Sequence, residues 1–177
     1  MYSKQNNMKL SVKETAVFGM LGALMYASKV LMDVLPNIHL IGTFIVAFTL
    51  VYRKKALYPI YIFVFLHGLF SGFNAWWVPY LYTWTILWAM TMFIPKKLPK
   101  KIEPVVYMSV CSLHGFLYGI LCAPSQAIFF GLDFKGMLTW IGAGFSFDLV
   151  HGISNFICAS LVIPIVRILK RSEKFAR

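Results

Sequence analysis

An aspartate, a histidine and an asparagine interrupt the last long apolar segment of this chain, in the stretch FSFDLVHGISN at 145–155. Asp148, His151 and Asn155 follow Trp140 and Gly144 at spacings of 4, 4, 3 and 4, so all five share one face of a helix. A carboxylate near an imidazole offers a proton relay, acid–base chemistry, or charge and hydrogen bonds for a ligand. Because an ionisable group in a bilayer-spanning helix costs about 2.5–3.5 kcal/mol, we interpret this stripe as functional.

Other apolar segments carry similar stripes at helical spacing, and these faces would line a pocket if they converged. They offer aromatic stacking and hydrogen bonds to a small ligand. The residues are His67, Ser71 and Asn74; His114, Tyr118, Ser125 and Gln126; and Trp77, Tyr80, Trp84 and Trp88.

Each of these stripes also has a structural interpretation. Aromatic residues near the outer interface are typical of a membrane belt. Trp84 and Trp88 lie deeper and fit core packing as well as ligand stacking, and His67 fits a core histidine bonded to a neighbouring helix.

Metal and nucleophile chemistry find little support in the sequence. The spacing D-x-x-H at Asp148 and His151 lacks the H-E-x-x-H or cysteine pairs of zinc sites, so no metal is predicted. No G-x-S-x-G elbow is present, and the three cysteines show no C-x-x-C spacing. We therefore expect a binding protein and not an enzyme.

The composition predicts a single all-α domain that is integral to a membrane. Of the 177 residues, 59% are hydrophobic and 13% are charged, and the mean hydropathy is +0.72, well above that of a soluble domain. Residues 1–177 form one transmembrane domain in this interpretation, and the first span is too long for a signal-peptide core. The six predicted spans are 12–35, 39–52, 56–73, 77–94, 104–130 and 137–169.

The basic residues predict the orientation of this domain. Fifteen of the 17 Lys and Arg fall in the N-terminal tail, the 53–55 and 96–101 connections, and the C-terminal end; the exceptions are Lys29 and Lys135. Positive charge is retained on the cytoplasmic side, so both termini are predicted to be cytoplasmic in a multi-pass protein of the cell membrane. Because this placement explains the net charge of +11, no nucleic-acid partner is predicted.

The first outer connection carries candidate residues for a lid. Pro36 breaks the helix in DVLPNIHL, and Asn37 and His39 follow it above the predicted pocket. Lys29 and Asp33 stand one helical turn apart, a spacing that predicts an ion pair.

The first span also has a smooth face built from small residues. In FGMLGALMYAS, Gly19, Ala23 and Ala27 recur at a spacing of four, which lets another helix approach closely. The partner helix could belong to the same chain or to another subunit.

Six spans in a short chain, cytoplasmic termini, Ala23-x-x-x-Ala27 and polar stripes in later helices together resemble the substrate-binding S components of energy-coupling factor (ECF) transporters, a type of ABC transporter. The stretch HGISN is similar to the corresponding stretch of thiamin-binding members, although thiamin is not assigned. The resemblance implies uptake of a vitamin or related micronutrient. Gly19, Ala23 and Ala27 would contact a transmembrane coupling subunit, and two cytoplasmic ATPases would use the ATP, so this chain itself binds no cofactor.

The predicted function is therefore capture of a small water-soluble ligand, a flat polar heterocycle, from outside the cell. Two alternatives stay open: a small intramembrane enzyme, or a self-sufficient proton-coupled carrier, each using Asp148 and His151. The predicted ligand site consists of Asp148, His151, Asn155, Trp84, Trp88, Tyr80, His114, Trp140, Gln126, Asn74 and His39.

Overall fold

The computed structural model describes residues 9–175, and in this range the chain is helical with no strand. The predicted all-α class is confirmed. Lys4 and Arg177, which contribute to the predicted charge asymmetry, lie outside the described residues. The elements are α1 (Val12–Leu31), α2 (Ile41–Tyr52), η2 (Arg53–Ala56), α3 (Leu57–Ser71), α4 (Tyr80–Phe93), α5 (Glu103–Phe116), α6 (Tyr118–Phe130), α7 (Phe134–Cys158), η3 (Ala159–Leu161) and α8 (Val162–Phe175).

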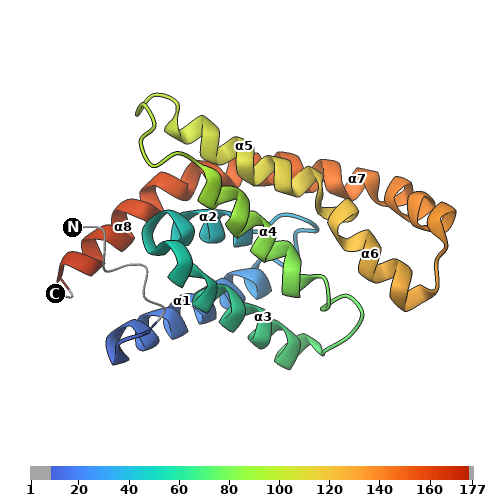
Figure 1. Ribbon diagram of the computed structural model, residues 1–177, viewed down its shortest axis with the longest axis horizontal. Helices are drawn as coiled ribbons and strands as arrows, with labels where there is room; N and C mark the ends of the chain where they lie inside the picture. Colours follow the sequence, from blue (N-terminus) through green and yellow to red (C-terminus); the bar gives the residue numbers. More distant parts are fainter. Residues whose placement is uncertain (1–8, 176–177) are drawn as a thin grey trace.

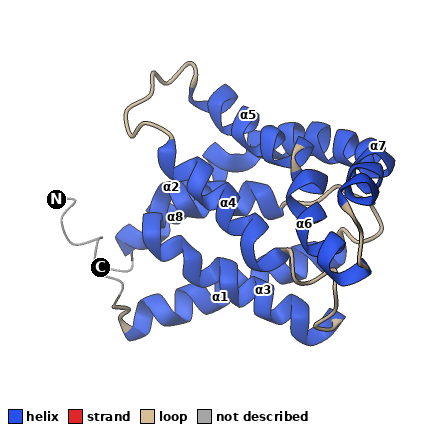
Figure 2. Cartoon of the chain, turned by 45° about the vertical axis from the view of Figure 1, so that its right-hand side comes forward, coloured by secondary structure: helices blue, strands red, loops and turns tan. Residues whose placement is uncertain are grey.

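The chain runs back and forth between the two ends of a helical bundle (Figure 1). The start of α1, the η2 turn, the α4–α5 loop and the end of α8 lie at the left, and the α1–α2, α3–α4 and α6–α7 connections lie further to the right. Figure 2 shows the same arrangement from another side, with α1 beside α3 and α5 beside α7. The basic segments 53–55 and 96–101 therefore lie at the same end of the bundle.

Two continuous helical stretches, Glu103–Phe130 and Phe134–Ser172, are long and apolar enough to cross a membrane. Each runs through a break in its helix geometry, at Leu117 and at η3 respectively. By length and composition, these two stretches are candidate membrane spans.

Helix α2 forms the centre of the bundle. All of its residues except Leu50 are buried, and it packs against α4 and α8. Its sequence, IGTFIVAFTLVY, is apolar on every side, as expected for a helix enclosed by others, and the Thr49 hydroxyl donates to the Ile45 carbonyl at 2.7 Å. Because other helices surround α2, this helix can be shorter than the thickness of a bilayer.

The predicted segment 104–130 is divided at Leu117 into α5 and α6. In the first turn of α6, the amide of Gly119 donates to Oδ1 of Asp148 on α7 at 2.9 Å. A carboxylate is favoured at a helix N-terminus because the amides there lack partners within the helix. Asp148 therefore stabilises the start of α6.

The predicted segment 137–169 begins earlier and changes geometry near its end. Asp133 caps α7 by accepting from the Gly136 amide at 2.7 Å, so the helix starts at Phe134. The short η3 helix precedes Pro164, which cannot donate to the carbonyl of Ser160 one turn earlier. The other predicted ranges differ by a few residues from α1 (Val12–Leu31), α2 (Ile41–Tyr52), α3 (Leu57–Ser71) and α4 (Tyr80–Phe93).

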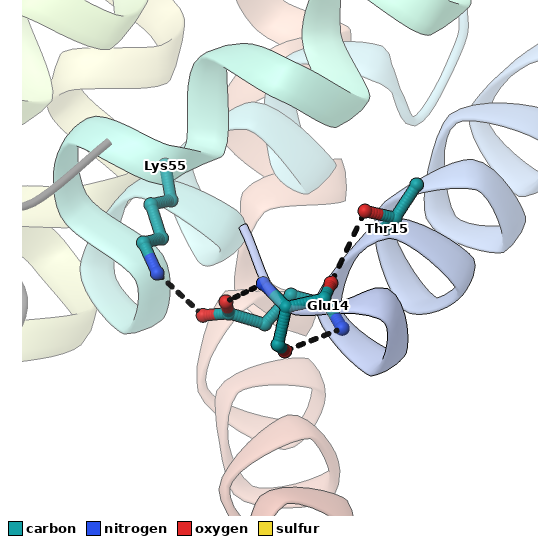
Figure 3. A network of polar contacts seen from close by, with 4 residues as sticks. Glu14, Thr15 and Lys55 are labelled. Atoms are coloured by element: carbon teal, nitrogen blue, oxygen red, sulfur yellow. Dashed lines mark hydrogen bonds and ion pairs between the residues drawn. The ribbon is translucent and has the colours of Figure 1, made fainter. Parts of the chain in front are cut away.

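Polar contacts fix the start of α1 against the η2 turn (Figure 3). Ser11 and Glu14 form a capping box, in which Ser11 Oγ accepts from the Glu14 amide at 3.2 Å and Glu14 Oε2 accepts from the Ser11 amide at 2.9 Å. The remaining Glu14 oxygen accepts from Nζ of Lys55 at 2.6 Å. Glu14 thus both caps α1 and ties it to the connection between α2 and α3.

Helices α5 and α7 approach each other through glycine. A Cβ placed on Gly115 would lie 2.8 Å from Cα of Gly152 and 2.9 Å from Nδ2 of Asn155. The Ser112 hydroxyl donates to the Gly152 carbonyl at 2.9 Å across the same interface. The backbones therefore come too close for a side chain at this point.

Replacing Gly115 by alanine is expected to lower stability by about 1–3 kcal/mol, because the new methyl group meets backbone that cannot move aside. The matched control is Gly142→Ala on α7, where an added Cβ meets nothing within 4 Å. Alanine there should be neutral or stabilising by about 0.5–1 kcal/mol. Melting temperatures of both purified variants in detergent test this, and equal values would contradict the described helix contact.

Candidate ligand-binding cavity

A cavity of about 230 Å³ lies beneath the connection between α1 and α2. Its walls come from residues of the segment 29–39, from Tyr80 of α4, Tyr118 of α6 and His151 of α7. Since α1 begins at the end of the bundle that carries the basic segments, this cavity lies away from that end (Figure 1).

The α1–α2 connection is held over the cavity by turns and by one contact with α7. The Leu35 amide donates to the Met32 carbonyl at 2.9 Å. Asn37 has a positive φ of 59°, a conformation that asparagine adopts more readily than most residues. Its carbonyl accepts from the Ser154 hydroxyl at 2.9 Å. The predicted lid segment thus covers the cavity and is fastened to α7.

Two imidazole rings form part of the buried side of the cavity. The ring centroids of His39 and His151 lie 4.8 Å apart at an interplanar angle of 79°, and Tyr118 lies 4.8 Å from His151. His151 is 2% exposed, and neither of its ring nitrogens has a hydrogen-bond partner within the protein. Nδ1 of His39 is likewise buried without a partner. These nitrogens are unsatisfied within the protein, which is uncommon for buried polar groups.

Trp84 lies behind this wall at the centre of an aromatic cluster. Its ring centroid is 5.3 Å from Tyr80, 6.0 Å from His39 and 5.7 Å from Tyr118. The side chain is 1% exposed and does not line the cavity. Trp84 therefore supports the lining rings from behind.

Lys29 and Asp33 stand at the more exposed side of the cavity. They form an ion pair one helical turn apart, so the predicted pair is confirmed. The Lys29 side chain is 20% exposed and that of Asp33 is 54% exposed. The cavity consequently has an ionic rim and an aromatic interior.

Asp148 lies outside the cavity, although it shares a helix face with His151. It is buried, and its carboxylate accepts the Gly119 amide as described above. Of the predicted site residues, His39, Tyr80 and His151 line the cavity.

The other predicted site residues make contacts elsewhere in the bundle. Asn74 accepts the amides of Trp76 and Trp77 and so shapes the connection before α4. The remaining ones are His114, with Nε2 at 2.9 Å from the Thr83 carbonyl; Gln126, donating to the Ala75 carbonyl at 3.2 Å; Trp88, donating to the Arg53 carbonyl at 3.0 Å; Asn155, donating to the Cys111 carbonyl at 3.5 Å; and Trp140, with its ring centroid 6.4 Å from that of Trp76.

Tyr118, Lys29 and Asp33 line the cavity without having been selected as site residues from the sequence. Tyr118 stands one turn after His114 in a stripe that the spacing already indicates. For Lys29 and Asp33, the ion-pair interpretation was correct but did not reveal that a cavity lies beside the pair.

Among the described residues, no three His, Cys, Asp or Glu side chains are placed to hold a metal ion.

Comparison with known proteins found no matching family model, no similar curated protein and no similar solved structure. The function is therefore inferred from the cavity and from the arrangement of the helices.

His151→Phe is expected to raise the free energy of unfolding by about 1 kcal/mol, because it removes two buried nitrogens that have no protein partner. His114→Phe is the control: like His151 it has an unpartnered nitrogen, Nδ1, but it also loses the Nε2 contact with the buried Thr83 carbonyl and should lower stability. Thermal unfolding of both variants in detergent compares them. A His151→Phe protein that melts as low as His114→Phe would show that the His151 nitrogens do have partners.

Asp148→Ala is expected to destabilise the protein by about 1–3 kcal/mol, because the buried Gly119 amide loses its acceptor. Ser146→Ala removes a polar group from an exposed position on the same helix and serves as the control. The two melting temperatures should differ by several degrees, and an unchanged value for Asp148→Ala would rule out this capping role.

Proposed function

We propose that this chain is the substrate-binding S component of an ECF-type importer. It captures a small water-soluble ligand from outside the cell and delivers it inward with the help of partner subunits. The observation that carries the proposal is the cavity beneath the α1–α2 connection, in which His151 is buried with both ring nitrogens unpartnered. A protein interior keeps such nitrogens at a cost, which binding of a ligand would offset.

Six transmembrane passes with cytoplasmic termini fit the helix arrangement. The passes are α1, α2, α3, α4, α5 with α6, and α7 with α8. Large apolar side chains are exposed on the outer surfaces, among them Ile128, Phe145 and Ile157, as expected for helices that face lipid. The basic segments at one end of the bundle belong on the cytoplasmic side by the positive-inside rule. This orientation opens the cavity to the outside.

The outward face of α1 supports contact with a transmembrane coupling subunit. Ala23 and Ala27 are exposed, and a Cβ on Gly19 would meet nothing within 4 Å. Gly22, which lies about 100° around α1 from Ala23, packs against Ile62 of α3. Small residues on the free side let a second helix approach closely. Two ATPases bound to that coupling subunit would supply the energy for transport.

The enzyme and proton-carrier alternatives have less support. Both require Asp148 and His151 to act on one ligand or on one proton path. Asp148 instead caps α6 through Gly119 and does not line the cavity with His151. Ligand binding without chemistry is therefore the function that the geometry favours.

Ala23→Trp is expected to abolish co-purification with a tagged coupling subunit and its two ATPases, because the indole blocks close helix approach at the exposed face of α1. Ala143→Trp is the matched control, since Ala143 is also an exposed helical alanine but lies on α7. The complexes are isolated from cells that express all the subunits, and the retained chain is quantified.

The proposal is supported if the wild type and Ala143→Trp co-purify with the coupling subunit and Ala23→Trp does not. If the wild-type chain never joins the coupling subunit, or if Ala23→Trp binds as the wild type does, the S-component function is wrong.

A further inference from the structure

The formal charges around the cavity balance. Among the described residues that line it, Lys29 carries the positive charge and Asp33 the negative charge, with histidine counted as neutral. The other lining side chains are aromatic, apolar or uncharged polar groups. A ligand with a net charge would leave one charge uncompensated in a partly desolvated space, which is unfavourable. The cavity thus favours a ligand whose own charges sum to zero.

The ion pair at the rim has unused hydrogen-bonding capacity. An ammonium has three donors and a carboxylate accepts at several lone pairs, whereas Lys29 and Asp33 share a single contact. The Lys29 ammonium can therefore bind a carboxylate, and the Asp33 carboxylate can bind an ammonium, while the two side chains stay close. Both groups are partly exposed, so a ligand can reach them from outside.

The buried side of the cavity fits a flat ring. Tyr80, Tyr118, His39 and His151 line the cavity and offer aromatic rings to an occupant. At about 230 Å³ the space is smaller than the roughly 300–1,000 Å³ of pockets for drug-sized molecules. One small ring system with a short polar side chain matches this size.

We propose that the cavity binds a small zwitterion that carries one planar ring system. The ring packs against the tyrosines and histidines, the ligand carboxylate pairs with Lys29, and the ligand ammonium pairs with Asp33. This inference rests on the proposed ligand-binding function and narrows the substrate to molecules with one positive and one negative group.

Two series of probes test the charge requirement on the purified full-length chain in detergent by isothermal titration calorimetry. The first is L-tryptophan, tryptamine, indole-3-propionate and indole; the second is L-phenylalanine, phenethylamine, 3-phenylpropionate and benzene. Within a series the ring is constant and only the charged groups change. In at least one series the zwitterion should bind roughly tenfold more tightly than each of the other members.

Single substitutions at the ion pair should shift this preference in opposite directions. Lys29→Met leaves the Asp33 carboxylate and should favour the amine, whereas Asp33→Asn leaves the Lys29 ammonium and should favour the carboxylate. The exchange variant Lys29→Asp/Asp33→Lys keeps both charges and should keep the zwitterion preferred. A folding defect would weaken all probes together and could not produce opposite shifts.

The proposal is overturned if no probe binds in either series, if a singly charged or uncharged probe binds as tightly as its zwitterion, or if the single variants fail to shift the preference. If this proposal fails but co-purification with the coupling subunit is intact and depends on Ala23, the S-component function is still supported. If the chain binds the zwitterion but never joins a coupling subunit, this substrate class is supported and the importer function is wrong.

Discussion

The close backbone contact between α5 and α7 determines where the walls of the cavity lie. Gly115 and Gly152 meet without side chains between them, and α6 follows α5 after one residue. The same contact brings Tyr118 at the start of α6 beside His151 on α7. Further along α7, Ser154 holds the carbonyl of Asn37 and so fixes the α1–α2 connection. Three parts of the cavity wall are therefore positioned by one helix, α7.

Polar residues of α7 serve two different purposes. Asp148 and Ser154 each bond to the backbone of another segment, so their burial contributes to the fold. His151 is equally buried but finds no partner for its ring nitrogens. An unsatisfied buried group costs about 1–3 kcal/mol, and such costs concentrate at binding sites. A ligand that bonds to His151 would then stabilise the folded protein by mass action.

Helical spacing correctly predicted that Asp148, His151 and Asn155 share a buried face, but it could not tell what each contacts. Residues three apart on a helix differ by roughly 60° in direction, so neighbours within one stripe can face different segments. His151 meets Tyr118, whereas Asp148 meets the start of α6. The break at Leu117 was equally hidden, because no proline or glycine occupies that position and the contact that stabilises it comes from a distant residue.

Helix α1 connects the two surfaces on which the proposed function depends. Its C-terminal end carries Lys29 beside the cavity, and Ala23 lies on its outward face, less than two turns away. The inner side of α1 rests on α3, and Glu14 ties its start to Lys55. Because an α-helix is stiff over this length, a displacement of α1 on ligand binding would alter both surfaces together. A ligand shifts such an equilibrium only through contacts that differ between two positions of the helix, and the ion pair at the cavity rim is where α1 offers those contacts.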